Sequence, residues 1–543
     1  MKRIINTVLV TATLSSAAFT LNSCQDALDI EQAGELQEQE IYTNISNLRE
    51  VLNGSVYAQL DPIDEIYFTA VFTDEVKPGS GSGGQEYSLH RHFLDASSAV
   101  VAGGTVNNDT SAGIWMNNYK VINRVNRLLE GAKNIDPASG SEKEEYNSIL
   151  AQARAVRAYC YVQLEAYFST DMKDPDALGV ILLKDVPATD AQLPRVKNQD
   201  VYDFINADLD YAREILAYST TIAGRYFADK GFVNAISARF NLYRGNTALA
   251  KQYAQDVISN SNLSLTQATP FTIKNDDSQS PDFNNDLVIG SSKWNERFYG
   301  VASSFNPYRN LWNDSSRGEI IFSLNRLPLG AGETIGSRWN TNQSNITGTP
   351  MWFWGRNLYN LFQTIPGDIR KYAYSDPTSN PNANYASATS GTTRTDALVI
   401  DKYPGKTSTP TRNDIKVFRL SEMYFILAEA EVAAGNLSIA RDLIQQVREA
   451  RNYQGAAVTN NYTSPQVAYA DILKERRIEL ALEGHRYLDL KRLAVAANVT
   501  MDRNDTDDII PMKNLPNGDY RYTLPIPIRE ISANPNAKQN NGY

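Results

Sequence analysis

The chain has 543 residues, of which 42% are hydrophobic, so it is long enough to build at least one large core. Its formal net charge of -10 argues against nucleic acid or an anionic membrane surface as the main partner, since both favour clustered Lys and Arg. The two cysteines, Cys24 and Cys160, predict no internal disulfide, and Cys160 is expected to be buried in a helix.

The N-terminus has the layout of an export signal. Lys2 and Arg3 precede an uncharged, mostly apolar stretch at residues 4–21. It ends in L-N-S-C at residues 21–24, which resembles a bacterial lipobox and implies cleavage after residue 23 and acylation of Cys24. A plain secretory peptide or a membrane-spanning anchor are the alternatives, but the stretch is short and hydroxyl-rich for a bilayer helix.

Residues 24–40 are predicted to form an acidic tether. Asp26, Asp29 and Glu31 closely follow Cys24, and acidic residues in this place resemble the surface-export signal of Bacteroidetes lipoproteins. We therefore expect a lipid-anchored protein in the outer membrane that faces the cell exterior.

Most of the remaining periodic signal is helical, because apolar residues recur every three or four positions. Helices are predicted at residues 47–60, 113–131, 141–169, 199–217, 229–259, 415–434, 437–452 and 468–493.

Two of these blocks share a template. Ala238, Gly245-Asn246 and Ala250 in one block have the same spacing as Ala428, Gly435-Asn436 and Ala440 in the other. Small residues let antiparallel helices approach closely, and Gly-Asn supplies the turn between them, as in tetratricopeptide helix pairs. The sequence therefore predicts a mainly α, tetratricopeptide-like helical-repeat scaffold. Such scaffolds are usually platforms for partners.

The character changes between the N-terminal helical-repeat region, residues 41–261, and the C-terminal helical repeats and tail, residues 415–543. Residues 262–414 are rich in Asn, Ser, Gly, Thr and Pro and show one strand-like run at Glu319–Asn325. We predict a large loop-rich, irregular subdomain without helices, packed on the helical layer. The stretches 77–84 and 375–398 are predicted to be surface loops.

Five motifs stand out along the chain: A-R-A-V-R-A-Y at 153–159, L-P-R-V-K-N-Q-D-V-Y-D-F-I at 193–205, R-L-S-E-M-Y-F-I-L-A-E-A at 419–430, E-R-R-I-E-L-A-L-E-G-H-R-Y-L-D-L-K-R-L at 475–493 and P-I-P-I-R-E-I-S-A-N-P-N-A-K-Q-N-N-G-Y at 525–543. Together they resemble the SusD/RagB family of nutrient-binding lipoproteins. The resemblance implies about four tetratricopeptide-like helix pairs and a loop-rich ligand-binding subdomain. It also implies a lid role over a SusC-like TonB-dependent transporter.

Catalytic and metal-binding patterns are weak. In the charged 475–493 segment, acids alternate with arginines, so ion pairing within the helix explains the pattern without chemistry. His90 and His92 share one segment, but no third ligand lies nearby in sequence, so we expect no metal and no cofactor. Residues 502–508 resemble the start of a calcium loop but lack the Gly at its sixth position, which favours a solvated acidic loop.

The distribution of tryptophan is the most informative anomaly, because five of the six tryptophans lie within residues 294–354 of the loop-rich region. Aromatic rings can stack on the axial C–H faces of sugars, although an irregular subdomain also needs bulky residues for its own core. Residues 291–356 also carry six Arg and one Lys against four acids, which leaves an acidic glycan open. The candidate ligand-binding residues are Trp294, Tyr299, Trp312, Trp339, Trp352 and Trp354, together with His90 and His92.

The family's starch-binding founder carries a tryptophan in the loop after its first repeat, whereas this chain has none before Trp115. The corresponding loop offers H-R-H-F at residues 90–93, so starch is not the expected ligand. We expect a non-enzymatic lipoprotein that captures a poly- or oligosaccharide for the transporter. Peptide capture, as in the RagB-like branch, is the alternative, and a hydrolase is a remote one.

Overall fold

The computed structural model describes most of the chain beyond residue 40, and we restrict structural statements to these residues. The predicted signal peptide (1–23), the tether (24–40) and Cys24 lie outside them. The described ranges are 41–82, 86–94, 110–138, 140–268, 291–299, 307–327, 334–339, 350–387, 395–407, 409–507 and 514–543.

Helices dominate the N-terminal half, as the periodicity predicts. Sequence reasoning missed two of them, α4 and α5. α4 is buried on nearly all sides and therefore lacks a polar stripe, and α5 has only four residues, too few to show a period. The elements are α3 (Ile45–Val51), the π-helical η1 (Leu52–Tyr57), α4 (Ile63–Phe72), β1 (Val76–Pro78), α5 (Tyr87–His90), α6 (Thr110–Ala132), α7 (Ser141–Phe168), β2 (Leu178–Ile181), β3 (Arg195–Lys197), α8 (Asn198–Ile215) and the 3-10 turn η4 (Ala223–Tyr226).

The two segments with the shared template each form a helix hairpin. α9 (Lys230–Tyr243) leads into α10 (Thr247–Asn260), and α16 (Leu420–Ala433) leads into α17 (Leu437–Ala450). Gly245 and Gly435 take positive φ values of 79° and 82°, which favour glycine. The template alanines, Ala238, Ala250, Ala428 and Ala440, are fully buried. The mainly helical fold class is thus confirmed, whereas the number of repeats stays a prediction.

The predicted helix at 468–493 is wrong as one element. α18 (Pro465–Glu479) ends before a tight turn, and α19 (Arg486–Ala497) begins after it. Leu482 and Gly484 both have positive φ in that turn, and the buried carboxylate of Glu75 accepts the backbone N–H of Leu482. The start of the 415–434 block is also not helical, because residues 415–419 form a strand.

The region predicted to be free of helices contains several short ones. Their lengths explain the error, because four to eight residues give too little periodicity to recognise. The elements are α11 (Ser292–Tyr299), α12 (Pro307–Trp312), β4 (Ile320–Leu324), α13 (Ile335–Trp339), β5 (Trp352–Trp354), α14 (Arg356–Gln363), α15 (Arg370–Ala373) and the 3-10 turn η5 (Tyr385–Ser387), followed by β6 (Ile415–Arg419). The predicted strand run at 319–325 is confirmed by β4.

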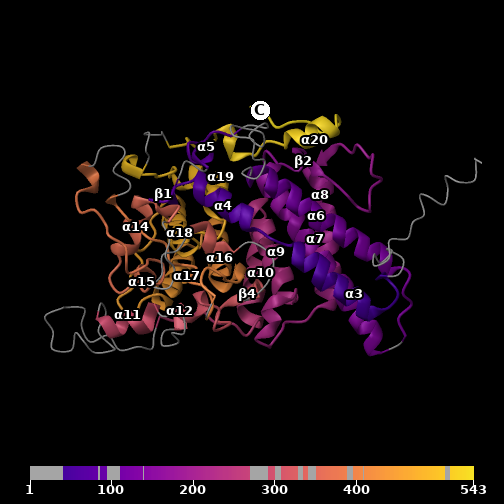
Figure 1. The fold of residues 1–543 in the computed structure, drawn as a ribbon, viewed down its shortest axis with the longest axis horizontal. Helices are drawn as coiled ribbons and strands as arrows, with labels where there is room; N and C mark the ends of the chain where they lie inside the picture. Colours follow the sequence, from indigo (N-terminus) through magenta and orange to yellow (C-terminus); the bar gives the residue numbers. More distant parts are fainter. Residues whose placement is uncertain are drawn as a thin grey trace, which may run out of the picture.

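Short antiparallel strand pairs join segments that are distant in sequence. β1 pairs with β5, and β4 pairs with β6. The predicted surface loop at 77–84 is therefore wrong at its start, because Lys77 lies buried in β1 with its ammonium 2.7 Å from Asp396. Figure 1 shows α3, α6, α7 and α8 on one side of the molecule and α11, α14 and α15, beside α17 and α18, on the other.

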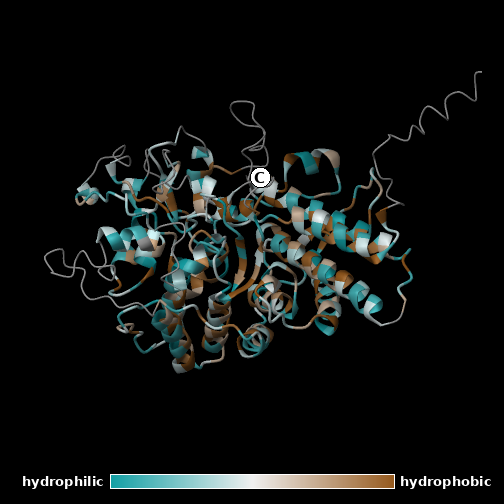
Figure 2. Cartoon of the chain, turned by 60° about the horizontal axis from the view of Figure 1, so that its bottom comes forward, coloured by the Kyte–Doolittle hydropathy of each residue, from teal (hydrophilic) through white to brown (hydrophobic). Residues whose placement is uncertain are grey.

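One hydrophobic cluster runs through both parts of the molecule. It includes residues of the N-terminal helices, the loop-rich region and the C-terminal helices, so residues 262–414 share their core with the helical layer. Figure 2 shows hydrophobic and hydrophilic stretches on the same helices, as expected for helices with one buried side. No helix in the described part of the chain is long and apolar enough to cross a membrane.

A cluster of buried ion pairs fastens the loop-rich region to the C-terminal helices. The carboxylate of Glu479 lies 2.7–3.1 Å from Arg370, Arg419 and Arg451, and Glu319 pairs with the last two of these. All five side chains, which we call the Glu479 cluster, are at most 1% exposed. Although burial by itself raises its pKa, the arginines hold the pKa of Glu479 well below its usual range.

The charges of the 475–493 segment are therefore structural, as predicted, but their partners are not. We expected ion pairs within one helix, whereas most partners lie on other elements, and most of the charged groups are buried. The acidic run after residue 501 contributes as well, since Asp502 accepts from Arg477 and Asp507 is buried beside Lys77. Among the described residues no group of acids, histidines or cysteines is arranged to hold a metal ion.

The C-terminal tail is held against α7 and the β2–β3 pair. The guanidinium of Arg195 donates to the carbonyl of Lys538 and to the side chain of Asn540 at 2.9 Å each. The Asn540 amide in turn donates to the carbonyl of Phe168, at the end of α7, and to that of Leu524. These contacts give a physical role to the polar residues of the 525–543 motif.

Glu65 on α4 supplies a pH-dependent test of the core. Burial raises its pKa from 4.5 to about 8, and the negative charge of the nearby Asp64 adds to this rise. A hydrogen bond from Asn118 acts in the opposite direction and lowers the pKa. Between these two values the folded state holds a proton that the unfolded chain has released, so this group makes stability fall as pH rises from about 4.5 to about 8. We expect Glu65→Gln to remove this slope, and the melting temperature of the variant minus that of the wild type to grow from pH 5 to pH 8. A constant difference across that range contradicts the buried, protonated carboxyl.

Candidate functional site

The structure corrects the expected exposure of the candidate tryptophans. Each of the five has at most 1% of its surface exposed, and a ring without exposed surface has no face to offer a ligand. Their direct stacking role therefore loses its support. The five are Trp294, Trp312, Trp339, Trp352 and Trp354.

These rings build the core of the loop-rich region, which was the alternative explanation. Trp294 stacks on Phe298 with ring centroids 4.5 Å apart, and the half-buried Tyr299 packs edge-on against it at 5.6 Å. Trp312 packs against Tyr374 at 5.8 Å, and the ammonium of the buried Lys402 lies 4.4 Å from its ring centre. Short helices cannot bury much apolar surface individually, so large rings fill the space between them.

The remaining candidates pack around Tyr67 of α4. The indole N–H of Trp352 donates to the Tyr67 hydroxyl at 2.9 Å, and the Trp339 ring lies 5.8 Å from the Tyr67 ring. Trp354 donates instead to the carbonyl of Tyr374. Each ring is held by partners far away in the sequence, which local patterns do not reveal.

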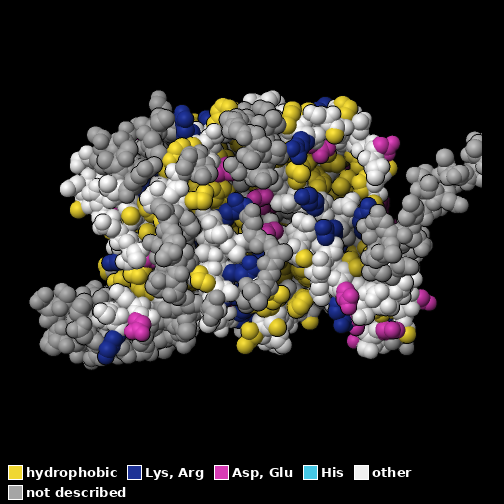
Figure 3. Space-filling view, viewed as in Figure 1, with side chains coloured by type: hydrophobic (Ala, Val, Ile, Leu, Met, Phe, Trp, Pro, Cys, Tyr) yellow, Lys and Arg dark blue, Asp and Glu magenta, His cyan; other side chains and the backbone are white. Residues whose placement is uncertain are grey.

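The two predicted histidines are also core residues. His90, at the end of α5, is 3% exposed and packs against Trp352 with ring centroids 5.5 Å apart. His92 is 2% exposed, and burial, followed by the charge of Arg503, lowers its pKa to about 3. Both imidazoles are therefore neutral at physiological pH. Figure 3 shows no histidine colour on the face that it presents, where basic and acidic side chains stand side by side near the middle.

The exposed aromatic of this segment is the neighbouring Phe93, with 54% of its surface accessible. Tyr520, from the C-terminal segment, is 47% exposed, and Arg521 beside it donates to the carbonyl of His92 at 3.0 Å. The Tyr543 ring packs edge-on against Tyr520 with centroids 5.1 Å apart. We call Phe93, Tyr520, Arg521 and Tyr543 the tail surface; α5 and the C-terminus lie together at the top of Figure 1.

Local contacts hold the tail surface in one arrangement. Gly542 has a φ of 97°, and a Cβ at this position would stand 2.3 Å from the Tyr520 ring, so only glycine lets the tail lie against that ring. The Tyr543 hydroxyl donates to the carbonyl of Thr523 at 2.9 Å. The two tyrosines are thus fixed before any ligand arrives.

The electrostatics of the tail surface suit a neutral ligand. Asp519 accepts two hydrogen bonds from the Arg521 guanidinium, at 2.8 and 2.9 Å, so the two charges compensate each other. The hydrogen bond from Arg521 lowers the pKa of Asp519, which makes this carboxylate a poor proton donor at neutral pH. The arrangement can stack and orient a ligand, whereas it offers no acid and base pair for hydrolysis.

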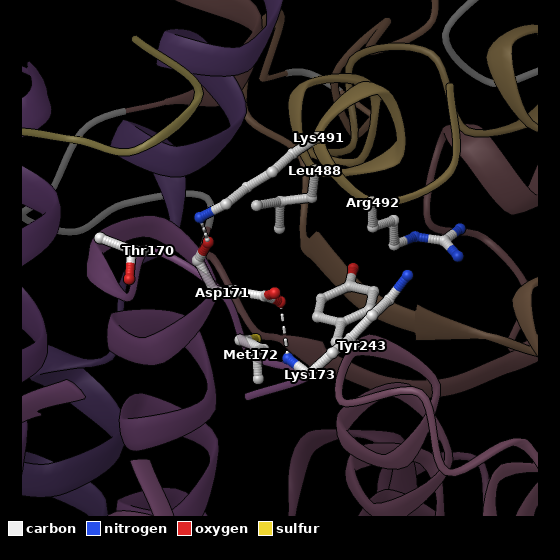
Figure 4. A pocket seen from close by; sticks show the side chains of 9 residues that line it. Thr170, Asp171, Met172, Lys173, Tyr243, Leu488, Lys491 and Arg492 are labelled. Atoms are coloured by element: carbon white, nitrogen blue, oxygen red, sulfur yellow. Dashed lines mark hydrogen bonds between the residues drawn. The ribbon is translucent and has the colours of Figure 1, made fainter. Parts of the chain in front are cut away.

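A separate pocket of about 80 Å³ lies between the end of α7 and α19 (Figure 4). Leu488, Met172 and Tyr243 supply much of its wall. The ammonium of Lys491 points to the end of α7, where it donates to the carbonyls of Ala166 and Ser169 at 2.9 and 2.8 Å. Burial lowers the pKa of Lys491 to about 7. Lys491 thus completes the C-terminus of α7, a structural role that accounts for its position.

Sequence reasoning missed Tyr520 and passed over Phe93 in favour of its histidine neighbours. One signal was present, because Phe93 is a lone aromatic in the otherwise polar H-R-H-F run. Tyr520 lies in D-Y-R-Y, where nothing local distinguishes the exposed Tyr520 from the buried Tyr522.

The fold and the tail surface together define a class of protein: a mainly helical scaffold that carries a loop-rich region and an exposed, preorganised aromatic surface. Two family models match the chain. A model described as the SusD family matches residues 331–543, and one described as starch-binding associating with outer membrane matches residues 56–242. The chain belongs to the SusD/RagB family, as its motifs predict.

Relatives match along nearly the whole chain. Three SusD-like proteins of Formosa agariphila are each 24% identical over 96–97% of this chain and of their own. A SusD superfamily structure from Bacteroides thetaiotaomicron superposes with a TM-score of 0.69 at 21% identity, covering 92% of this chain and all of that one. A laminarin-binding SusD-like protein superposes with a TM-score of 0.64 at 20% identity over 92% of this chain and all of that one. The structural likeness shows a shared fold.

Proposed function

We propose that this protein is a cell-surface lipoprotein that binds a poly- or oligosaccharide and delivers it to a SusC-like TonB-dependent transporter. The exposed aromatic pair of the tail surface, Phe93 and Tyr520, carries the proposal, because aromatic faces stack on the C–H faces of sugar rings. One family model is described as starch-binding associating with outer membrane, and one structural neighbour binds laminarin. Both support a glycan ligand, and the first also supports a location at the outer membrane.

Peptide capture by strand addition finds less support. That mode needs an exposed strand edge to which a peptide can add main-chain hydrogen bonds. The described strands have three to five residues, and all residues of β1, β4, β5 and β6 are buried. The β2–β3 pair is the exception among the described strands, with Leu178 and Val196 half-buried and Lys197 exposed.

The binding proposal is tested by Phe93→Ala. An exposed ring contributes little to the core, so the melting temperature should stay near that of the wild type. Loss of one stacking contact should weaken binding by about 1–3 kcal/mol, tenfold or more in dissociation constant. Affinity electrophoresis with laminarin, xylan, galactomannan and dextran finds the ligand, and calorimetry measures it.

Val458→Ala is the matched control, because Val458 is 76% exposed and lies in the connection between α17 and α18, which is not part of the tail surface. Its binding should equal that of the wild type. If Phe93→Ala binds every glycan as the wild type does, the tail surface is not the site. New reducing ends formed by the purified protein would contradict a non-enzymatic role.

The membrane anchor is tested by Cys24→Ala. We expect the variant to move from the outer-membrane fraction to the soluble fraction, because acyl chains on Cys24 supply the membrane affinity of the mature protein. Metabolic labelling with a fatty acid should mark the wild type and leave the variant unmarked. A variant that is still labelled and still sediments with membranes contradicts lipidation at this residue.

A further inference from the structure

A groove of about 420 Å³ opens on the helical part of the molecule and shares no lining residue with the tail surface. Its sides come from α7 and from the connection between α8 and α9, residues 216–229. We name it the Phe227 groove, after the ring at its edge, and it also contains Ser148, Gln152, Ser219 and Thr221. Its volume falls within the range typical of small-molecule sites in proteins.

Phe227 is an exposed aromatic in a rigid setting. It is 44% exposed, and its ring meets that of Tyr57 edge-on with centroids 6.0 Å apart. The Tyr57 hydroxyl accepts the N–H of Ala228 at 2.8 Å and donates to the Gln152 side chain at 2.9 Å. One buried hydroxyl therefore fixes both the backbone beside Phe227 and the amide across the groove.

The connection itself is also held firmly. The Arg317 guanidinium donates to the carbonyls of Ser219 and Thr221 at 3.2 and 2.7 Å. The carboxylate of Asp229, which caps α9, accepts the N–H groups of Ser219 and Phe232 at 2.9 Å each. A loop anchored in this way keeps Phe227 at the surface and does not fold its ring inward, so the groove is formed before any ligand binds.

The polar groups that face the groove are neutral and bifunctional. Gln152 donates one amide hydrogen to Ser148 at 3.2 Å, which leaves the other without a partner among the described residues. The hydroxyls of Ser219 and Thr221 lie 3.4 Å apart and can each donate or accept. Among the described residues that line the groove there is no Lys or Arg, and the lining carboxylate of Asp229 already accepts two backbone N–H groups. This lining suits a neutral ligand better than a charged one.

We propose that the Phe227 groove is a second glycan-contact site, which takes a short run of neutral pyranose units by stacking one ring on Phe227 and hydrogen-bonding its hydroxyls to Gln152, Ser219 and Thr221. The proposal rests on the glycan-binding function proposed above. A polymer held at both this groove and the tail surface dissociates more slowly than one held at either, because the second contact is intramolecular. The groove thereby favours long chains over short oligosaccharides.

The test compares Phe227→Ala, Phe227→Leu, Phe93→Ala and the Phe93→Ala/Phe227→Ala double variant by affinity electrophoresis in laminarin, xylan, galactomannan and dextran. Phe227→Leu keeps apolar bulk without a ring, and Ile222→Ala is the matched control, since Ile222 is 69% exposed on the same connection but does not line the groove. We expect roughly tenfold weaker retention for both Phe227 variants, a larger loss in the double variant and none in Ile222→Ala, with unchanged melting temperatures.

The outcomes separate the two proposals. Weakening by Phe93→Ala together with normal retention of both Phe227 variants overturns the second site and leaves the proposed function intact. A wild type that none of these polysaccharides retains overturns both for neutral glycans. Equal losses of retention in Ile222→Ala and Phe227→Ala show that the conformation of the connection matters and that the Phe227 ring does not stack on the glycan. This result also overturns the second site.

Discussion

Glu479→Ala is expected to destabilise the protein by about 3–5 kcal/mol, the magnitude typical for breaking a buried ion pair by removing one partner. The variant leaves Arg370, Arg419 and Arg451 buried, with Glu319, Asp368, Glu475 and Glu483 as their remaining acids. Taking several charges out of water is tolerable only while hydrogen-bonded partners compensate them. The melting temperature and the urea midpoint measure the effect.

The matched control is Glu449→Ala. Glu449 is an exposed acid near the end of α17, and it accepts one hydrogen bond, from Gln445, at 2.8 Å. Its removal should change stability by less than about 0.5 kcal/mol, as for most surface substitutions. If both variants melt together with the wild type, the Glu479 cluster does not hold the loop-rich region to the helices.

Trp312→Ala should also destabilise the protein by about 3–5 kcal/mol, the usual loss when a core aromatic is truncated. The ring is fully buried between Tyr374 and Tyr403, and the ammonium groups of Lys402 and Lys416 lie 4.4 and 5.2 Å from its centre. Truncation creates a cavity and removes the ring that these buried cations face. Thermal and urea denaturation of the variant check this expectation.

Phe93→Ala is the comparison for Trp312→Ala, because it removes an exposed aromatic ring instead of a buried one. Phe93 is more than half exposed, so its loss should spare the melting temperature and affect binding alone. A Trp312→Ala protein with wild-type stability and weakened glycan binding would reverse the assignment of this ring to the core.

Several features of the fold could be predicted because they depend on residues close together in the chain. The Gly245-Asn246 and Gly435-Asn436 turns need only a left-handed residue between two apolar periodicities, and both hairpins form where the spacing predicts. β4 was recognisable as a short, mostly apolar run with β-branched and aromatic residues, Ile320-Ile321-Phe322, beside polar stretches. The 475–493 and 525–543 motifs identified the family, since long motifs specify more than composition does.

Local sequence patterns gave wrong or missing predictions where the pairing of charges and the burial of a helix depend on residues far away in the chain. The 475–493 segment was predicted to be one helix with ion pairs between its own residues. A turn divides it instead, and its charges pair with residues such as Asp74, Glu429 and Arg370. Nothing within the segment reveals these partners. The same limitation hid α4, whose apolar residues are covered from several directions.

The sequence by itself determined the mainly helical class and the family, and it predicts a lipid anchor at Cys24, because all three follow from local periodicity or contiguous motifs. Only the tertiary structure decided which aromatics face solvent. Burial of Trp352 depends on Tyr67, 285 residues away, and exposure of Tyr520 depends on Gly542 letting the tail pack against one side of its ring. Tryptophans in polar stretches of the sequence therefore lie in the core, whereas Phe93, beside two histidines, lies at the surface. The exposure of each ring depends on which distant residues pack against it.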